Sequence, residues 1–301
     1  MKKTMRVVLL VAVILMIGFL PAYQAGAAAA GIESGRHHFF TFNKAMLKND
    51  MQLQERGVVA VKRISLAASA IKGFQINPIL EPALRYEDYV KNPVEMKVSQ
   101  QTIFRELGRY AKELSNQDTL IIYSHTHGVK NQFKEGEPWG GMRLDIKGET
   151  LPHQGVTIWS DYADALLSIP AKNVVVLVMC CYSGGFVDYL RKIENQWKNR
   201  AETGRNFLVI TSQNNILTSD PVRIDGETYN PFTSAVERAL QGKADGYKSG
   251  KPDGAVTLEE FVSFLMDTTH KLSDQAFPQS IGSYNKGEVL YSLNSPMDRG
   301  K

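Results

Sequence analysis

A run of five apolar residues, at positions 174–178, constrains the fold of this chain more than any other feature. Such a short, continuous and mostly β-branched run is typical of a central strand in a parallel sheet that is buried on both faces. Residues 180–184, with the sequence CCYSG, follow almost directly. A thiol at the end of a buried strand is either a small core side chain or a reactive group at the sheet edge where α/β proteins place their chemistry.

Further apolar runs alternate with helical patterns along the chain. This alternation predicts an α/β fold with a mostly parallel central sheet and helices on both faces. Pro78 restricts its strand to the edge or the end of the sheet, Ser160 is expected to cap a helix, and Thr257 with Glu260 forms a capping box. The predicted strands are residues 37–42, 74–80, 119–123, 174–178 and 207–211, and the predicted helices are residues 51–71, 99–114, 162–167, 186–197, 232–240 and 257–266, with a small hairpin at 142–146.

The first 30 residues differ in kind from the rest. Lys2, Lys3 and Arg6 precede an apolar run over residues 7–20, and small residues follow at positions 25–30. This order is typical of a secretory signal peptide, and the apolar run is shorter than the ~20 residues that span a bilayer. We therefore expect a signal peptide at 1–30, one domain at 31–301, export to the periplasm or the extracellular space, and no stable membrane anchor.

The net charge and the cysteine content limit the classes of function that this chain could have. Without residues 1–30 the chain has 32 basic against 31 acidic residues, which gives no support for a nucleic-acid partner. The two cysteines are adjacent, and a disulfide between neighbours is geometrically awkward. An exported protein that keeps unbridged thiols suggests a reactive role for them. The oligomeric state stays open.

Two predicted strands end in reactive side chains. Residues 124–128, with the sequence SHTHG, follow one strand, and residues 180–184 follow the other. If these strands are neighbours, an imidazole faces a thiol, and a histidine is the base that such a thiol needs to become a thiolate nucleophile. The backbone N–H groups of Gly128 and Cys181 are the natural donors to a developing oxyanion.

These motifs resemble those of the caspase-like cysteine peptidases: caspases, metacaspases, legumains and their bacterial relatives. That family shares a strand ending in His-Gly and a later strand ending in Cys-x-Ser-Gly, and residues 210–214, 230–240, 253–265 and 278–279 also follow in the expected order. The resemblance implies a caspase-like (caspase–hemoglobinase) fold with His127 as general base and Cys181 as nucleophile. It also implies the N–H groups of Gly128 and Cys181 as the oxyanion hole, a peptide or protein substrate, and no cofactor.

The substrate pocket departs from the family pattern. Metacaspases and legumains have an acidic residue two positions before the nucleophile, where this chain has Met179. The preference for the residue before the cleaved bond, P1, therefore stays open. Ser212, Gln213 and Asn214 follow another buried strand and are candidates for the pocket lining. Asp161, Asp188 and Asp220 are pocket or triad-like acids that no motif fixes.

The remaining candidates are the second histidine and the second cysteine. His125 lies two residues before His127, but a zinc site needs further ligands and no His/Cys cluster has the spacing. His125 is therefore expected to support the site by a hydrogen bond or to be exposed, and no metal is expected. Cys180 is expected to pack as a small hydrophobic side chain. Residues 249–260 resemble a calcium loop, but Lys251 in a ligand position excludes calcium.

The sequence thus predicts an exported cysteine endopeptidase that acts through a Cys181–His127 dyad and an acyl-enzyme. Two alternatives stay open: a catalytically inactive caspase-like binding protein, and a thiol–disulfide oxidoreductase, which the lack of a Cys-x-x-Cys motif disfavours. The long loops after His127 and Trp197 suggest autoprocessing as a further hypothesis.

Overall fold

The computed structural model describes residues 35–44, 51–81, 98–130, 140–144 and 156–293. The predicted signal peptide, the loop around Trp139 and part of the predicted 142–146 hairpin lie outside these ranges. All the elements below belong to residues 36–301, which form one unit.

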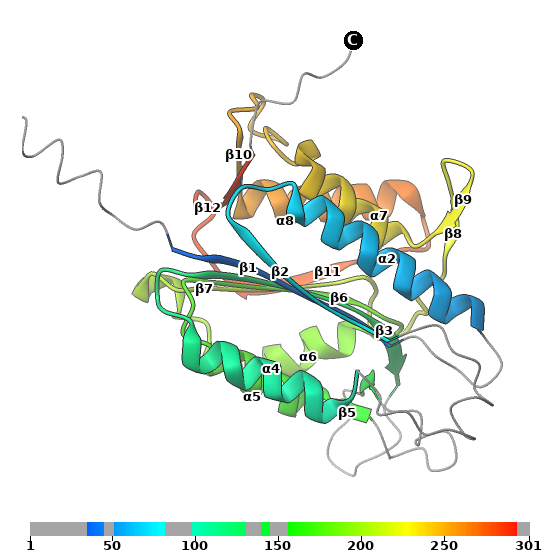
Figure 1. Cartoon of the computed structure of the whole chain (residues 1–301), viewed down its shortest axis with the longest axis horizontal. Coiled ribbons are helices and arrows are strands. Elements are labelled where there is room, and N and C mark those ends of the chain that lie inside the picture. The colour runs from blue at the N-terminus through cyan, green and yellow to red at the C-terminus, as the bar shows by residue number, and fades with distance from the viewer. Residues whose placement is uncertain (1–34, 45–50, 82–97, 131–139, 145–155, 294–301) are drawn as a thin grey trace, which may run out of the picture. The chain divides into compact units, whose positions relative to one another are not determined.

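The central feature is a sheet whose main strands run in the order β11-β7-β6-β3-β1-β2 (Figure 1). All neighbouring pairs along this path are parallel except β11 with β7. The edge strand β2 contains Pro78, as predicted, because an edge position does not require both sides of the backbone to pair. The strands are β1 (His37–Lys44), β2 (Phe74–Leu80), β3 (Thr119–Val129), β6 (Asn173–Met179), β7 (Asn206–Thr211) and β11 (Gln279–Ser283).

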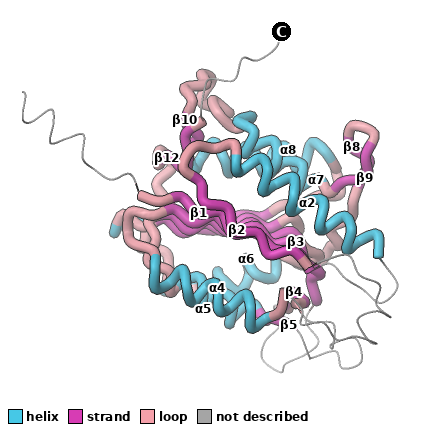
Figure 2. Tube along the Cα trace, in the orientation of Figure 1, coloured by secondary structure: helices cyan, strands magenta, loops and turns pink. Residues whose placement is uncertain are grey.

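Helices cover both faces of this sheet (Figure 2). One layer contains α2 (Met51–Ser69), α7 (Pro231–Arg238) and α8 (Leu258–Leu272), and the other contains α4 (Gln100–Glu113), α5 (Trp159–Leu167) and α6 (Gly184–Lys192). Each layer packs on its own buried cluster of apolar side chains. The predicted fold class, α/β with a mostly parallel sheet between helices, is therefore confirmed.

Short elements complete the described part of the chain. The strands β4 and β5 extend the sheet beyond β3, while β8 with β9 and β10 with β12 form two small antiparallel pairs. Their bounds are Gly141–Arg143 (β4), Val156–Ile158 (β5), Val222–Ile224 (β8), Glu227–Tyr229 (β9), Ala255–Thr257 (β10) and Val289–Ser292 (β12), with single helical turns at Glu194–Gln196, Ala201–Thr203 and Ala239–Lys243.

Side-chain alternation assigns each strand residue to one helix layer. On β3, Ile121 and Tyr123 belong to the cluster under α2, α7 and α8, whereas Ile122 belongs to the cluster under α4, α5 and α6. On β6, Leu177 and Met179 lie in the first cluster, because residues that are paired across parallel strands share a face.

Several predicted boundaries are wrong. Residues 124–128 lie within β3 rather than beyond it, because β6 and then β4 continue to pair with the strand. Helix α5 begins at Trp159 with Ile158 at its N-cap, so Ser160 is not the cap. Of the predicted 142–146 hairpin, residues 145 and 146 lie outside the described residues, and the described part, β4, pairs with β3 and β5.

Two predictions about helix ends have opposite outcomes. The helix after Cys181 ends at Lys192 rather than near residue 197. The capping box of Thr257 and Glu260 is present at the start of α8 and is confirmed. In the described ranges, no helix is both long and apolar enough to cross a membrane.

Candidate active site

The two motif-bearing strands, β3 and β6, are neighbours in the sheet. Their last register pair joins His125 to Met179, and both chains then continue past the carboxyl edge. The chain after β6 turns at residues 180–183 and enters α6 at Gly184. Residues of both strands before this point are buried, whereas His127 and Cys181 are half-buried. The predicted base and nucleophile therefore both reach partial exposure at the same edge of the sheet.

Gly128 lies directly against the turn that carries the thiol. A Cβ atom added to Gly128 would lie 1.6 Å from the carbonyl oxygen of Cys181 and 3.1 Å from Sγ of Cys180. The φ angle of Gly128 is not positive, so the glycine is required here for close approach rather than for an unusual backbone conformation. This contact brings the His-Gly and Cys-x-Ser-Gly motifs together.

The two cysteines differ in burial: Cys180 is buried and Cys181 is half-buried. Cys180 belongs to the cluster under α4, α5 and α6, opposite to the face of Tyr123 and Met179. Alternation along β3 places His127 on the face of Tyr123. Cys181 lies one residue further along the turn after β6 and is half-buried. Burial raises the pKa of the Cys180 thiol well above its usual value, and the nearby Cys181 adds to this rise. Cys180 thus packs as a small core side chain, as predicted from sequence.

The environment of the Cys181 thiol favours its neutral form. Burial raises its pKa, and the carboxylate of Asp220 adds to the rise. The backbone N–H of Ser219, 3.4 Å from Sγ, and that of Cys181 itself lower the pKa. Because the neutral form is favoured, the thiol needs a base to become a nucleophile.

The N–H of Cys181 is one of the two predicted oxyanion donors. In the described part of the chain it donates no hydrogen bond to another residue. The second predicted donor belongs to Gly128, whose backbone packs directly against the carbonyl group of Cys181. The two residues that supply the predicted donors are thus adjacent in space.

His125 is a buried partner of the site. Its Nδ1 lies 3.3 Å from the hydroxyl of Tyr123, which lies 2.7 Å from the hydroxyl of Thr233 on α7. Burial, together with the smaller effect of the nearby His127, lowers the pKa of His125 to about 3. Of the two roles expected for His125, exposure is excluded. The described residues contain no cluster of three or more His, Cys, Asp or Glu side chains that could hold a metal ion.

Ser212 holds the backbone of the turn that carries the thiol through two hydrogen bonds. Its Oγ accepts a hydrogen bond from the Cys180 N–H (3.3 Å) and donates one to the Cys180 carbonyl oxygen (3.1 Å). The hydroxyl of Ser183 accepts the N–H of Gln213 at 3.1 Å. These contacts join the turn after β6 to the end of β7, a structural role that the sequence analysis did not assign to Ser212.

Two further residues of the turn, Tyr182 and Gly184, contact the backbone of the loop after β7. Tyr182 has a φ of 55°, which is unusual for a bulky residue, and its N–H donates to the Leu217 carbonyl at 3.0 Å. A Cβ added to Gly184 would lie 2.6 Å from the backbone of Asn214 and of Asn215. Ser183 and Gly184 of the motif therefore serve the packing that holds the turn.

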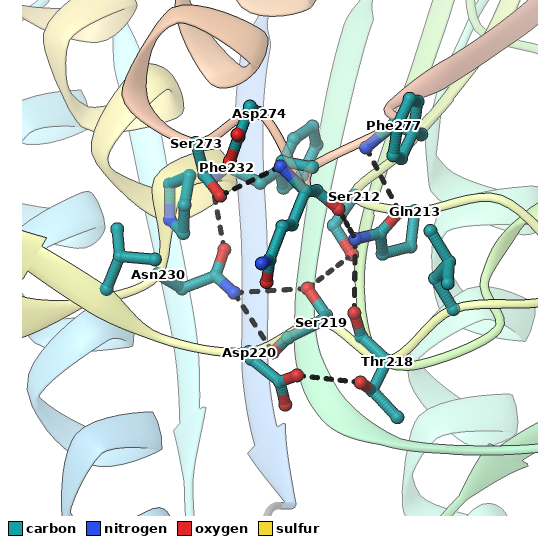
Figure 3. Close-up of a pocket in the computed structure, with 15 residues that line it drawn as sticks. Ser212, Gln213, Thr218, Ser219, Asp220, Asn230, Phe232, Ser273, Asp274 and Phe277 are labelled. Atoms are coloured by element: carbon teal, nitrogen blue, oxygen red, sulfur yellow. Dashed lines mark hydrogen bonds between the residues drawn. The ribbon is translucent and has the colours of Figure 1, made fainter.

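A cavity of about 300 Å³ adjoins this turn, and we call it the Ser219 cavity (Figure 3). The N–H of Ser219, a lining residue, is the group that contacts Sγ of Cys181. The fifteen lining residues come from the loop after β7, the first residue of β8, the start of α7 and the loop after α8: Ser212, Gln213, Leu217, Thr218, Ser219, Asp220, Val222, Asn230, Pro231, Phe232, Ser273, Asp274, Gln275, Ala276 and Phe277.

The candidate pocket residues separate into three groups. Ser212 and Gln213 line the Ser219 cavity, and Asn214 lines a neighbouring cavity of about 420 Å³. Met179 is buried in the core and lines neither. Of the unassigned acids, only Asp220 lines the Ser219 cavity.

Comparisons with known proteins concern the fold. No protein-family model and no curated protein matches the chain. Among solved structures, the chain is similar to the protein GSU0716 from Geobacter sulfurreducens, with 13% identity and a TM-score of 0.49 over 86% of this chain and 100% of that one. It is also similar to caspase-1 from Spodoptera frugiperda, with 11% identity and a TM-score of 0.48 over 88% of this chain and 93% of that one. Such similarities do not assign a reaction.

Proposed function

We propose that this protein is a cysteine peptidase of the caspase-like type, with Cys181 as nucleophile and His127 as general base. The observation that carries the proposal is the contact between Gly128 and the Cys181 carbonyl at the carboxyl edge of the sheet. This contact supports a common site for the two motifs, and the half-exposure of His127 and Cys181 leaves both within reach of a substrate.

The proposed reaction has two steps. His127 takes the proton of the Cys181 thiol, and the thiolate attacks the peptide carbonyl carbon. The C–N bond breaks as the imidazolium gives its proton to the leaving amine, which leaves a thioester on Cys181. A water molecule, deprotonated by His127, then attacks the thioester, releases the carboxylic acid and regenerates the thiol. The N–H groups of Gly128 and Cys181 are the proposed donors to the oxyanion.

The surroundings of the thiol support a requirement for His127. Burial and Asp220 both raise the pKa of Cys181, so a thiolate does not form readily without a base. The Ser219 N–H, 3.4 Å from Sγ, stabilises the negative charge once it forms. We expect general-base assistance to contribute about 10²–10⁴-fold to the rate.

The structure gives little support to thiol–disulfide exchange. That reaction needs a second thiol that can reach the first, and Cys180 is buried in the apolar cluster under α4, α5 and α6. A catalytically inactive binding protein is the alternative that an experiment must decide.

Profiling of a mixed peptide library with the purified protein tests the proposal. We expect cleavage by the wild type and by Cys180→Ser, which removes the other thiol and serves as the matched control. Cleavage should be lost in Cys181→Ala and reduced about 10²-fold or more in His127→Ala. If the wild type cleaves no peptide under reducing conditions, the protein is a binding protein and not a peptidase.

A further inference from the structure

The Ser219 cavity has a defined position relative to the proposed nucleophile. Ser219 contributes to the cavity wall and also places its N–H 3.4 Å from Sγ of Cys181. A substrate whose carbonyl carbon lies at Sγ would therefore lie beside a residue of the cavity wall. The volume of about 300 Å³ lies at the lower end of the range for small-molecule pockets, which suits a single amino-acid side chain.

Three amide side chains line the cavity, and those of Gln213 and Asn230 are already engaged. Nε2 of Gln213 donates to the carbonyl oxygens of Thr218 (3.1 Å) and Gln275 (2.7 Å). Nδ2 of Asn230 donates to the hydroxyl of Ser219 (3.1 Å), as Figure 3 shows. Because these two donors are used within the protein, the amide donor left to a substrate side chain is that of the exposed Gln275, which carries no charge and does not set the sign of a bound group.

The charged lining residues are Asp220 and Asp274, and no Lys, Arg or His is among the fifteen. Oδ2 of Asp220 accepts the hydroxyl of Thr218 at 2.7 Å. Within the described part of the chain, neither carboxylate forms an ion pair. Both are exposed, on different loops that border the cavity (Figure 3).

We infer that the Ser219 cavity receives a Lys or Arg side chain from the residue whose carbonyl Cys181 attacks. The inference rests on the proposed peptidase function and names its substrate class. Because the cavity lies beside Sγ, the side chain that enters it is that of the P1 residue. Because two carboxylates line the cavity, that side chain should be positively charged. The aliphatic stem of Lys or Arg would pack on Leu217 and Phe232, with the cationic group near the carboxylates. Asp220 and Asp274 would thus supply, from two other loops, the negative charge that Met179 lacks.

Asp220 has a second, opposing effect. Its negative charge raises the pKa of Cys181 and so disfavours the thiolate. Replacement of Asp220 by Asn should therefore make the free thiol more reactive, while it weakens the binding of a cationic substrate. A loss of folding or a displaced turn would instead reduce both properties.

Four fluorogenic peptides that differ only at P1, with Arg, Lys, Gln or Asp, test the inference. The variants are Asp220→Asn, Asp274→Asn, both together, and Asp225→Asn as the matched control. Asp225 lies in the turn between β8 and β9, is exposed, and does not line the cavity. The rate of Cys181 alkylation by iodoacetamide at pH 7.5 is measured for every variant, because this neutral reagent reports on the thiol alone.

We expect the wild type to cleave after Arg and Lys about 10-fold or more faster than after Gln, and to cleave after Asp least of all. The double variant should lose about 10-fold or more on Arg and Lys and little on Gln. Asp220→Asn should alkylate at least as fast as the wild type, and Asp225→Asn should match the wild type in every measurement.

Two results would overturn the inference and would be distinguishable. Equal cleavage after Gln and Arg by the wild type, or an unchanged preference in the double variant, would refute a cationic pocket and leave the peptidase in place. If neither these four peptides nor any member of the mixed library is cleaved, the proposed function itself fails, and the inference fails with it.

Discussion

Gly128 and Cys181 are in backbone contact: a methyl group added to the α-carbon of Gly128 would lie 1.6 Å from the Cys181 carbonyl oxygen. The obstacle is backbone and not a flexible side chain, so it cannot move aside without moving the thiol. The glycine after His127 is therefore explained by packing, and the contact joins the ends of two strands that are about 50 residues apart in sequence.

Gly128→Ala should reduce activity and stability together. The added methyl group must displace the turn that carries Cys181, and a displacement of about 1 Å in an active site can cost about 10²-fold in rate. Overpacking of this kind should also lower the free energy of unfolding by about 1–3 kcal/mol. Peptide cleavage and urea denaturation measure the two effects.

Gly108→Ala is the matched control for this variant. Gly108 lies within α4, and a Cβ added there would meet no other atom within 4 Å. Because Ala is favoured over Gly in a helix, this change should stabilise the protein by about 0.5–1 kcal/mol and leave activity unaltered. Full activity in Gly128→Ala would show that the contact does not hold the nucleophile in place.

Ser212→Ala should loosen the turn after β6. The change removes the hydroxyl that bonds both the N–H and the carbonyl of Cys180, and leaves these backbone groups unpaired. We expect the free energy of unfolding to fall by about 1–3 kcal/mol. We also expect kcat to fall more than KM rises, because the nucleophile is displaced. Urea denaturation and steady-state kinetics provide the measurements.

Ser69→Ala is a suitable comparison, since the hydroxyl of Ser69 is exposed and bonds only within α2. It should change neither stability nor kcat appreciably. An equally small effect of Ser212→Ala would contradict the proposal that the Ser212 hydroxyl holds the turn after β6 in place.

Stability should decrease as the pH falls from about 6.5 toward 3. Burial lowers the pKa of His125 to about 3, and it also lowers the pKa values of His37 and His38. Above about pH 6.5, these histidines are neutral in the folded and in the unfolded chain. Below that pH the unfolded chain binds protons that the folded chain does not, so each such histidine makes the free energy of unfolding fall with pH, by up to ~1.4 kcal/mol per pH unit for the fully buried His125.

Urea denaturation at pH 7.5 and at pH 5.0 measures this dependence. The wild type should be less stable at pH 5.0, and His125→Gln should show a smaller difference between the two pH values because one of the three histidines is removed. The same free energy of unfolding at both pH values would contradict the assignment of these histidines as neutral in the folded chain.

Export stays a prediction of the first 30 residues. Expression of the full chain in a bacterial host should yield a mature protein that begins near Gly31, and the intact mass of the purified protein measures this. A purified protein whose mass still includes residues 1–30 would contradict a cleaved signal peptide. A further internal cut in an active preparation would support autoprocessing, and an intact mature chain would exclude it.

Much of the fold could be predicted because the apolar runs are local signals. The runs at residues 119–123 and 174–178 identify two buried strands, and the side chains just past them identify the candidate dyad. Boundaries that depend on distant partners could not be predicted: β3 extends to Val129 because β4 pairs with it. Ser160 failed as a cap because the helix already begins one residue earlier.

The lining of the Ser219 cavity could not be predicted from the sequence either. Asp274 lies more than 90 residues after Cys181, in a loop with no motif. Hydrogen bonds of Gln213 with the backbone of Gln275 and Phe277 hold this loop beside the end of β7. The sequence places Ser212 close to the site, but it does not predict that Ser212 holds the turn. The hydrogen-bond partners of Ser212 are backbone atoms of Cys180, which follows a different strand, β6. Packing between distant segments leaves no local pattern in the sequence.

The central claim is that His127 activates Cys181, and its most direct test is labelling by peptidyl acyloxymethyl ketones with mixed P1 residues. These reagents react with activated thiols, and mass spectrometry maps the adduct. We predict one adduct, on Cys181, in the wild type and in Cys180→Ser. We predict none in His127→Ala, although iodoacetamide at pH 9 should still alkylate Cys181 in that variant. An adduct on Cys180, or labelling of Cys181 that does not depend on His127, would contradict the account.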